Sequence, residues 1–212
     1  MSTETAYIFK SAERQEEADA CMTRVYQVME DDSVTKYYAK QHKRFEFSCG
    51  LYASGYKALQ RDVMMITVPE NKGCALVLRQ PAQQWTVLGK IWHGGWKPLV
   101  TCVPLSYWRS LLSLGDKLEK HHKEFTQEHG AHLYVWVIVA EPQGLGLGGR
   151  LLRALTDLAD SEGLWCYLEA TTSRSRDLYA RHGFEQRDEW VVDAKELILY
   201  PMARSPRKMP NT

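Results

Sequence analysis

The feature that most constrains the fold is the segment 135–152, in which an apolar run passes through closely spaced glycines into an amphipathic helix pattern. Its sequence is Val-Trp-Val-Ile-Val-Ala-Glu-Pro-Gln-Gly-Leu-Gly-Leu-Gly-Gly-Arg-Leu-Leu. Glycines let a backbone approach a ligand closely, and a helix N-terminus presents unpaired N–H groups and the positive end of its dipole. The segment therefore predicts a strand, a turn and a helix that together bind a phosphate or pyrophosphate.

Two kinds of nucleotide site satisfy this pattern. Gly144, Gly146 and Gly149 fit the G-x-G-x-x-G of dinucleotide-binding folds, and Glu169 follows at the distance of the ribose-binding acid. Only about 40 residues follow Glu169, too few to complete a doubly wound sheet. The second pattern is Gln143-x-x-Gly146-x-Gly148, which resembles the acetyl-coenzyme A signature of the GNAT acetyltransferases.

Residues downstream of the glycines extend the second resemblance. Residues 169–184 resemble the GNAT segment in which a helix carries a tyrosine and ends at Gly-Phe, with Tyr179 and Gly183-Phe184 at the matching places. The run 167–169 and the closing segment 201–206 resemble the branch that contains puromycin N-acetyltransferase. The resemblance is strong over residues 131–206, whereas residues 1–130 agree only in the order of their elements.

The resemblance implies an acetyl-CoA site. The amides of residues 143–149 would hold the pyrophosphate with Arg150 nearby, and the backbone of residues 137–139 would hold the pantetheine arm and the acetyl carbonyl. The expected cofactor-binding residues are Val137, Ile138, Val139, Gln143, Gly144, Leu145, Gly146, Leu147, Gly148, Gly149, Arg150 and Ser175. Acetyl-CoA is expected as the co-substrate, without a metal ion.

Amine acetylation also needs a proton donor for the departing thiolate and a proton acceptor for the amine. By its place in the resemblance, Tyr179 is the acid candidate. Glu169 is the base candidate, because strand alternation puts it on the same face as Trp165 and Tyr167, where partial burial would raise its pKa. Two alternatives stay open: a pairing of Glu169 with Arg174 or Arg176, and a water relay to Glu169 or to His132.

Other residues have a simpler interpretation. His121 and His122 are adjacent on a predicted helix, point about 100° apart and are interpreted as surface residues. No cysteine lies in a nucleophile motif, which favours direct transfer without an acyl-cysteine. Several aromatic residues could line an acceptor pocket or fill the core: Tyr52, Tyr56, Trp85, Trp92, Trp96 and Trp108.

Composition sets broad limits. With 212 residues, 44% apolar and 25% charged, the chain can bury a full core. We expect one domain over residues 1–206, with an acceptor-shaping half (1–130), a cofactor-binding half (131–206) and a tail (207–212). The locally basic stretch 204–208 is interpreted as a frayed end.

Charge, cysteine usage and hydropathy indicate where such a chain works. The net charge of +1 gives no reason to expect nucleic acid as a partner, and no stretch approaches a membrane span or a signal peptide. The five scattered cysteines fit reduced thiols, so a cytoplasmic protein is expected. A homodimer is compatible with the sequence.

Periodicity predicts an α/β chain with a mixed sheet. Helices are predicted over residues 12–31 and 107–128 and after the glycines up to a stop at Gly163, and strands over 63–68, 74–78, 132–140, 164–170, 189–192 and 196–200. Residues 32–60 read as broken helix and loop, and the sheet is expected to begin at residue 63. The GNAT resemblance adds that the central parallel strands splay apart to admit the cofactor.

Together these patterns predict an N-acetyltransferase that moves acetyl from acetyl-CoA to a primary amine of a small molecule by direct attack. Three alternatives remain. The acceptor could be a protein or peptide amine, the chain could be an acyl-CoA-binding protein without catalysis, or the glycines could belong to an NAD(P)-dependent oxidoreductase.

Overall fold

The computed structural model describes residues 5–59, 63–81, 96–193 and 196–207. Its centre is a mixed sheet with the strand order β1-β2-β3-β4-β5-β8-β6, and β7 pairs with β8. The strands are β1 (Tyr7–Lys10), β2 (Val63–Thr67), β3 (Gly73–Gln80), β4 (His132–Ala140), β5 (Trp165–Ala170), β6 (Glu185–Gln186), β7 (Trp190–Asp193) and β8 (Leu197–Arg204). Among these strands β4 and β5 are the parallel pair, and the other described pairings are antiparallel.

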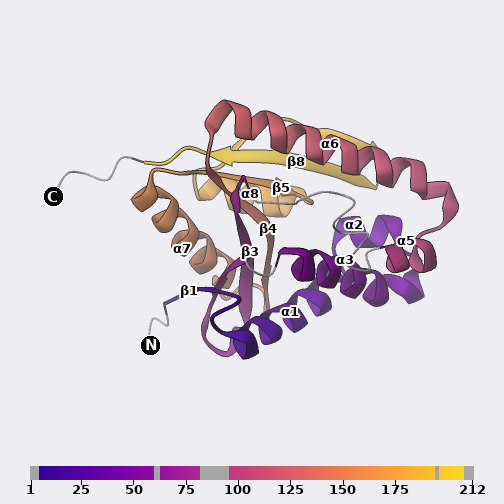
Figure 1. Ribbon diagram of the computed structural model, residues 1–212, viewed down its shortest axis with the longest axis horizontal. Helices are drawn as coiled ribbons and strands as arrows, with labels where there is room; N and C mark the ends of the chain where they lie inside the picture. Colours follow the sequence, from indigo (N-terminus) through magenta and orange to yellow (C-terminus); the bar gives the residue numbers. More distant parts are fainter. Residues whose placement is uncertain (1–4, 60–62, 82–95, 194–195, 208–212) are drawn as a thin grey trace.

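Helices cover both faces of the sheet (Figure 1). They are α1 (Gln15–Met29), α2 (Ser33–Tyr38), α3 (Arg44–Leu59), α5 (Trp96–Cys102), α6 (Leu105–His129), α7 (Leu147–Glu162) and α8 (Ser173–Arg181), with short 3-10 turns η1 (Gln41–Lys43) and η2 (Pro69–Asn71). One core lies between the sheet and helices α1, α3 and α6, and a second lies under α7 and α8. A third cluster joins α2, α3, α5 and α6 to β7 and β8.

The two parallel strands separate after a short pairing. His132, Leu133 and Tyr134 of β4 pair with residues 165–167 of β5, while β4 continues to Ala140. A bulge at Trp136 then shifts the register of β4 against β3, since Leu76 pairs with Val137 and Val77 with Val135. A bulge re-aims the side chains that follow it. The separated strands leave the opening that the GNAT resemblance implies.

The predicted strand, turn and helix at residues 132–163 are confirmed. Helix α7 buries its apolar stripe, including Leu151, Leu152 and Leu155, against the sheet. It ends at Gly163, which adopts a left-handed conformation with φ +67°. Glycine is favoured there because other L residues are strained at positive φ. The predicted stop of this helix at Gly163 is therefore confirmed.

The N-terminal half departs from the prediction in two places. The sheet begins at β1 and not at residue 63, because a four-residue strand with one buried side chain is too short for its alternation to stand out. Residues 44–59 form one continuous helix, α3, and not broken helix and loop. Gly50 and Gly55 lie inside it, where α3 passes close to Pro98 and Trp136.

The end of the sheet also differs from the prediction. Arg204 is not part of a frayed end: it is the last residue of β8 and only 4% exposed. Its guanidinium makes a two-point contact with Asp160 of α7, at 2.8 and 2.7 Å. A buried charge requires such a partner. The interpretation of residues 204–208 as a frayed end is therefore wrong for Arg204. Residues 208–212 lie outside the described part of the chain.

No helix within the described residues is long and apolar enough to cross a membrane. The five cysteines are free thiols, and Cys21, Cys74, Cys102 and Cys166 are buried.

Candidate active site

A cavity of about 480 Å³ opens at the glycine loop between β4 and α7. We call it the glycine-loop cavity. Its wall includes the end of β4, the glycines of the loop and residues of α8. The residues from the loop are Pro142, Gln143, Gly144, Gly146, Leu147, Gly148 and Gly149.

The glycine-loop cavity suits an anion. Gly146 is the N-cap of α7 with φ +71°, and no side chain caps this helix. The first N–H groups of α7 are therefore left for a ligand. Arg174 and Arg181 add positive charge, and the described lining contains no carboxylate. A Cβ built on Gly144 or Gly146 meets no atom within 4 Å, so the space above the loop is open.

A second cavity, of about 390 Å³, lies on the side of the sheet covered by α1 and α2. We call it the acidic cavity, because Asp31, Asp32, Glu141 and Glu169 line it and its described lining contains no lysine, arginine or histidine. Lys36 pairs with Asp31 at 2.9 Å, and Arg24 lies 3.5 Å from Glu141. Asp32 and Glu169 make no described ion pair with a lysine or arginine. This cavity suits a cationic ligand.

The two cavities share a wall, to which Ile138, Gln143, Ser175 and Tyr179 contribute. Tyr179 comes from the second turn of α8. Burial, followed by the charge of Asp32, raises the pKa of its phenol well above the ordinary value. The hydroxyl therefore keeps its proton at neutral pH, which a proton donor requires. The predicted acid lies where an anionic and a cationic ligand would meet.

Asp32 is a site residue that the sequence analysis missed. It caps α2 by accepting a hydrogen bond from the Val34 N–H at 2.9 Å, and its other oxygen accepts from the Thr171 hydroxyl at 2.7 Å. Burial raises the pKa of this carboxyl, while these hydrogen bonds oppose the shift. The Asp-Asp-Ser sequence before α2 signals a helix cap, but nothing local signals a cavity.

Glu169 lies on the wall of the acidic cavity with a side chain that is 7% exposed. It shares a face with Trp165 and Tyr167, as predicted. Its oxygens contact His122 Nε2 at 2.9 Å and the Tyr134 hydroxyl at 3.1 Å. The alternative in which Glu169 pairs with Arg174 or Arg176 is not what the structure shows. Arg176 binds Asp177, and Arg174 lines the glycine-loop cavity.

The interpretation of both histidines as surface residues is wrong for His122. Its side chain is 11% exposed and packs on Tyr134 and Tyr167, with ring centroids 4.3 and 5.5 Å away. The periodicity of α6 alone could not place it, because this helix crosses the sheet at a point that the tertiary fold decides. His132 does not reach the acidic cavity: it is 1% exposed and bonds the Gly130 carbonyl at 3.0 Å.

The structure brings most of the predicted cofactor residues to one place. Val137 lines the acidic cavity, Val139 the glycine-loop cavity, and Ile138, Gln143 and Ser175 both. Leu145 and Arg150 are outside the described linings, and Leu145 is 59% exposed. Ser175 also forms a capping box with Thr172, which fixes the start of α8.

The aromatic candidates divide between pocket, core and surface. Tyr52 lines the acidic cavity. Tyr56 is buried in the core, Trp108 packs on the third cluster and Trp96 is 49% exposed. Trp85 and Trp92 lie outside the described residues. Among the described residues no group of three or more histidine, cysteine or carboxylate side chains could hold a metal ion.

Comparison with known proteins relates both the fold and the glycine loop to acetyltransferases. Residues 112–184 match the model of the Acetyltransferase (GNAT) family, a span that runs from α6 through the glycine loop to the end of α8. Solved acetyltransferases superpose on nearly the full chain. The chain has the GNAT acetyltransferase fold. No curated protein matches its sequence at a significant level.

Three solved structures illustrate the likeness. A Corynebacterium glutamicum histone acetyltransferase HPA2 and related acetyltransferase has a TM-score of 0.58 and 15% identity, with 98% of each chain covered. An agmatine N-acetyltransferase has a TM-score of 0.59 and 13% identity over 94% of this chain and 99% of the other. The Drosophila melanogaster polyamine N-acetyltransferase has a TM-score of 0.58 and 15% identity over 94% and 99%. At such identities the likeness establishes the fold and not the substrate.

The GNAT fold settles how the glycines are to be interpreted. A dinucleotide-binding fold requires a doubly wound parallel sheet, whereas the sheet here has one described parallel pair with antiparallel strands on both sides. The G-x-G-x-x-G match is therefore coincidental. The comparisons support the GNAT family and do not single out the puromycin-like branch.

Proposed function

We propose that this protein is an acetyl-CoA-dependent N-acetyltransferase that acetylates the primary amine of a small molecule by direct attack. The observation that carries the proposal is that Tyr179 lies on the shared wall of a cavity lined by arginines and glycine-loop residues and a cavity lined by carboxylates. The pyrophosphate of acetyl-CoA would bind the amides at the start of α7, with Arg174 and Arg181 nearby. The thioester would then lie along β4, beside Tyr179.

The residues present supply the steps of the reaction. The amine gives up a proton to a carboxylate, for which Glu169 is the candidate, directly or through water. Its nitrogen then forms a bond to the acetyl carbon, and the C–S bond breaks. Tyr179 donates its proton to the thiolate and is reprotonated from the acetylated nitrogen, so that one proton is released to solvent per turnover.

The charge of the acidic cavity favours a cationic amine as acceptor. Asp32 and Glu169 would attract an ammonium group and exclude carboxylate substrates. Solved proteins of the same fold include acetyltransferases whose titles name agmatine, polyamines and arylalkylamines. A small basic amine is therefore the acceptor we propose first, and a protein amine is the alternative.

The test is acetyl transfer itself. Release of the CoA thiol is measured with acetyl-CoA and a panel of diamines, arylalkylamines and a lysine-rich peptide. Tyr179→Phe should lower kcat about 10²-fold, because a hydroxyl that acts as a proton donor contributes of this order. It should leave the stabilisation of the protein by acetyl-CoA unchanged.

Other outcomes would change the proposal. Stabilisation by acetyl-CoA without turnover of any amine would favour an acyl-CoA-binding protein without catalysis. Turnover of the peptide alone would favour a protein acetyltransferase. No stabilisation by CoA species would contradict the proposed cofactor site.

A further inference from the structure

The carboxylate of Glu169 is held from outside the acidic cavity by two donors on different elements. His122 of α6 places Nε2 at 2.9 Å from one oxygen, and Tyr134 of β4 donates its hydroxyl to the other at 3.1 Å. The side chains of His122 and Glu169 are 11% and 7% exposed. Glu169 lines the cavity, and His122 is outside its described lining.

Both contacts fix the orientation of the Glu169 carboxylate. A carboxylate oxygen can only accept, so in this contact we assign the donor role to His122 Nε2. Two donors on different elements restrict the rotation of the carboxylate, so it stays directed at the acidic cavity. Burial, followed by the charge of Glu169, raises the pKa of the Tyr134 hydroxyl well above the ordinary value, so it remains a donor.

The surroundings leave His122 as the residue that decides this geometry. Tyr167 of β5 faces the His122 ring edge-on. Burial, followed by the charge of Glu169 and a hydrogen bond to it, raises the pKa of the Tyr167 hydroxyl. The other titratable groups that act on this cluster are Asp188, Tyr52 of α3 and His132 of β4, and burial lowers the pKa of His132. Among the described groups, His122 is the basic side chain in contact with Glu169.

We propose that His122 is a positioning residue for the acetyl transfer: it holds the carboxylate of Glu169 directed at the acidic cavity, where Glu169 takes the proton of the acceptor ammonium. This inference rests on the proposed function. In the step, one N–H bond of the ammonium breaks and an O–H bond forms on Glu169, directly or through one water. The neutral amine keeps the electron pair that then forms the bond to the acetyl carbon, and Glu169 returns its proton to solvent.

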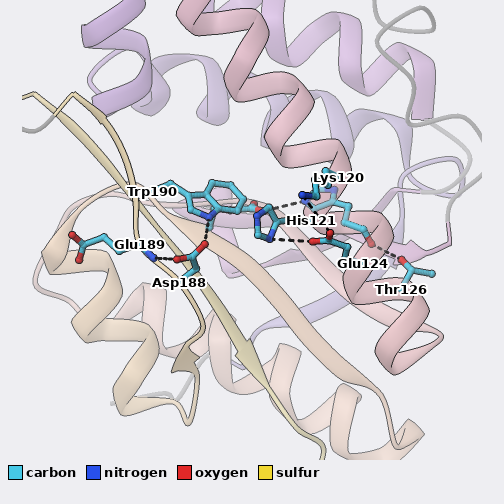
Figure 2. A network of polar contacts seen from close by, with 9 residues as sticks. Lys120, His121, Glu124, Thr126, Asp188, Glu189 and Trp190 are labelled. Atoms are coloured by element: carbon cyan, nitrogen blue, oxygen red, sulfur yellow. Dashed lines mark hydrogen bonds and ion pairs between the residues drawn. The ribbon is translucent and has the colours of Figure 1, made fainter.

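The experiment compares two polar replacements. The amide nitrogen of glutamine in His122→Gln can take the place of Nε2, whereas the shorter asparagine in His122→Asn cannot reach Glu169. The matched control is His121→Gln. Figure 2 shows that His121 points to Trp190, with ring centroids 4.6 Å apart, and that its Nδ1 faces Glu124 at 3.8 Å, so it belongs to a different contact network.

The readouts are kcat and KM for the amine at pH 7, the KM for acetyl-CoA, and Tm. His122→Asn should lower kcat/KM for the amine at least tenfold, mainly through kcat, with an unchanged KM for acetyl-CoA. His122→Gln should stay within about threefold of wild type, and so should His121→Gln. In the Glu169→Gln background, His122→Asn should cause no further loss, because two residues that act as a unit are not additive.

Contrary outcomes are separable. Equal losses in His122→Gln and His122→Asn, no loss in either, or additive losses with Glu169→Gln would overturn the positioning role while the acetyltransferase stands. If His122→Asn does not fold, a His122→Gln enzyme with a tenfold loss of kcat/KM overturns the role, and one with near-wild-type kcat/KM supports it. A wild-type protein that binds acetyl-CoA but acetylates no amine overturns both proposals.

Discussion

Thr171 donates a hydrogen bond to Asp32 at 2.7 Å and so joins two segments that lie 139 residues apart in the sequence. Asp32 caps α2 on the side of the acidic cavity, and Thr171 follows β5 directly before the cap of α8. The bond therefore fixes a carboxylate between the helix that lines the acidic cavity and the helix that carries Tyr179. The charge of Asp32 in turn raises the pKa of Tyr179.

We expect Asp32→Asn to separate stability from activity. Asparagine caps a helix as well as aspartate does, and it carries no charge to bury. Burial raises the pKa of Asp32 above 3.8. The folded protein therefore loses stability as pH rises from the pKa of this carboxyl in the unfolded chain to its higher pKa in the folded protein. The variant should therefore have a Tm at pH 7 at least equal to that of wild type, with no such advantage below pH 3.8.

The same Asp32→Asn variant should raise the KM for the amine about tenfold, because the acidic cavity loses a carboxylate. Thermal unfolding at pH 3.5 and 7 and steady-state kinetics check the two halves. Asp31→Asn, at a neighbouring side chain that is 80% exposed, should leave Tm unchanged. A lower Tm for Asp32→Asn at pH 7 together with an unchanged KM would contradict this role of Asp32.

Gly144→Ala should weaken binding of acetyl-CoA. Gly144 has φ +87°, where an alanine is strained by roughly 1–2 kcal/mol, and its new methyl group would occupy the open space above the loop. We expect the Kd for acetyl-CoA to rise at least tenfold by calorimetry. Gly115→Ala, in the middle of α6 with no atom within 4 Å of the new Cβ, should leave the Kd unchanged and raise stability by about 0.5–1 kcal/mol.

Asp160→Ala should destabilise the protein by about 3 kcal/mol, because it leaves the buried Arg204 without its partner. The control is Glu162→Ala on the same helix. Glu162 pairs with the half-exposed Arg79 at 2.6 Å, and such surface pairs contribute about 0–1 kcal/mol. Urea unfolding of both variants measures the difference in the free energy of unfolding. Equal losses would contradict the prediction that burial of Arg204 makes its ion pair the more stabilising one.

The Asp160–Arg204 pair also predicts a pH dependence. The hydrogen bonds from Arg204 lower the pKa of Asp160 below 3.8. The stability that the ionised Asp160 contributes is fully present above the pKa of Asp160 in the unfolded chain. It is lost as pH falls through the lower pKa of Asp160 in the folded protein. The difference in stability between wild type and Asp160→Ala should therefore shrink below pH 3.8 and stay constant from pH 5 to 8.

Gly55→Ala should disturb the acceptor side of the site. A Cβ at Gly55 would lie 2.5 Å from the ring of Trp136, which lines the acidic cavity. Overpacking of this kind costs about 1–3 kcal/mol, and the displaced ring should raise the KM for the amine more than that for acetyl-CoA. Gly50→Ala overlaps Pro98 just as closely but lies outside the described lining. It should lower Tm without a selective effect on the amine.

Sequence reasoning worked where the determining interactions are local. The apolar period, the glycines of the loop and the cap at Gly163 lie close together in the sequence, so the bounds of β4 and the end of α7 could be predicted. It failed where a single strand or helix depends on distant partners. β1 becomes a strand by pairing with β2, and α3 stays helical across two glycines because other elements approach it there.

By itself, the sequence determined the GNAT resemblance, the glycine loop and the identity of Tyr179 and Glu169 as candidates, because these depend on spacing within one βαβ unit and the helix after it. Only the tertiary structure decided that Asp32 and His122 belong with them. Asp32 is held near Tyr179 by its hydrogen bond from Thr171, which lies between β5 and α8, and His122 reaches Glu169 because α6 crosses the sheet at that point. These residues are far apart in the sequence, so no local pattern predicts their contacts. The burial and the charges that act on them arise only when the chain folds.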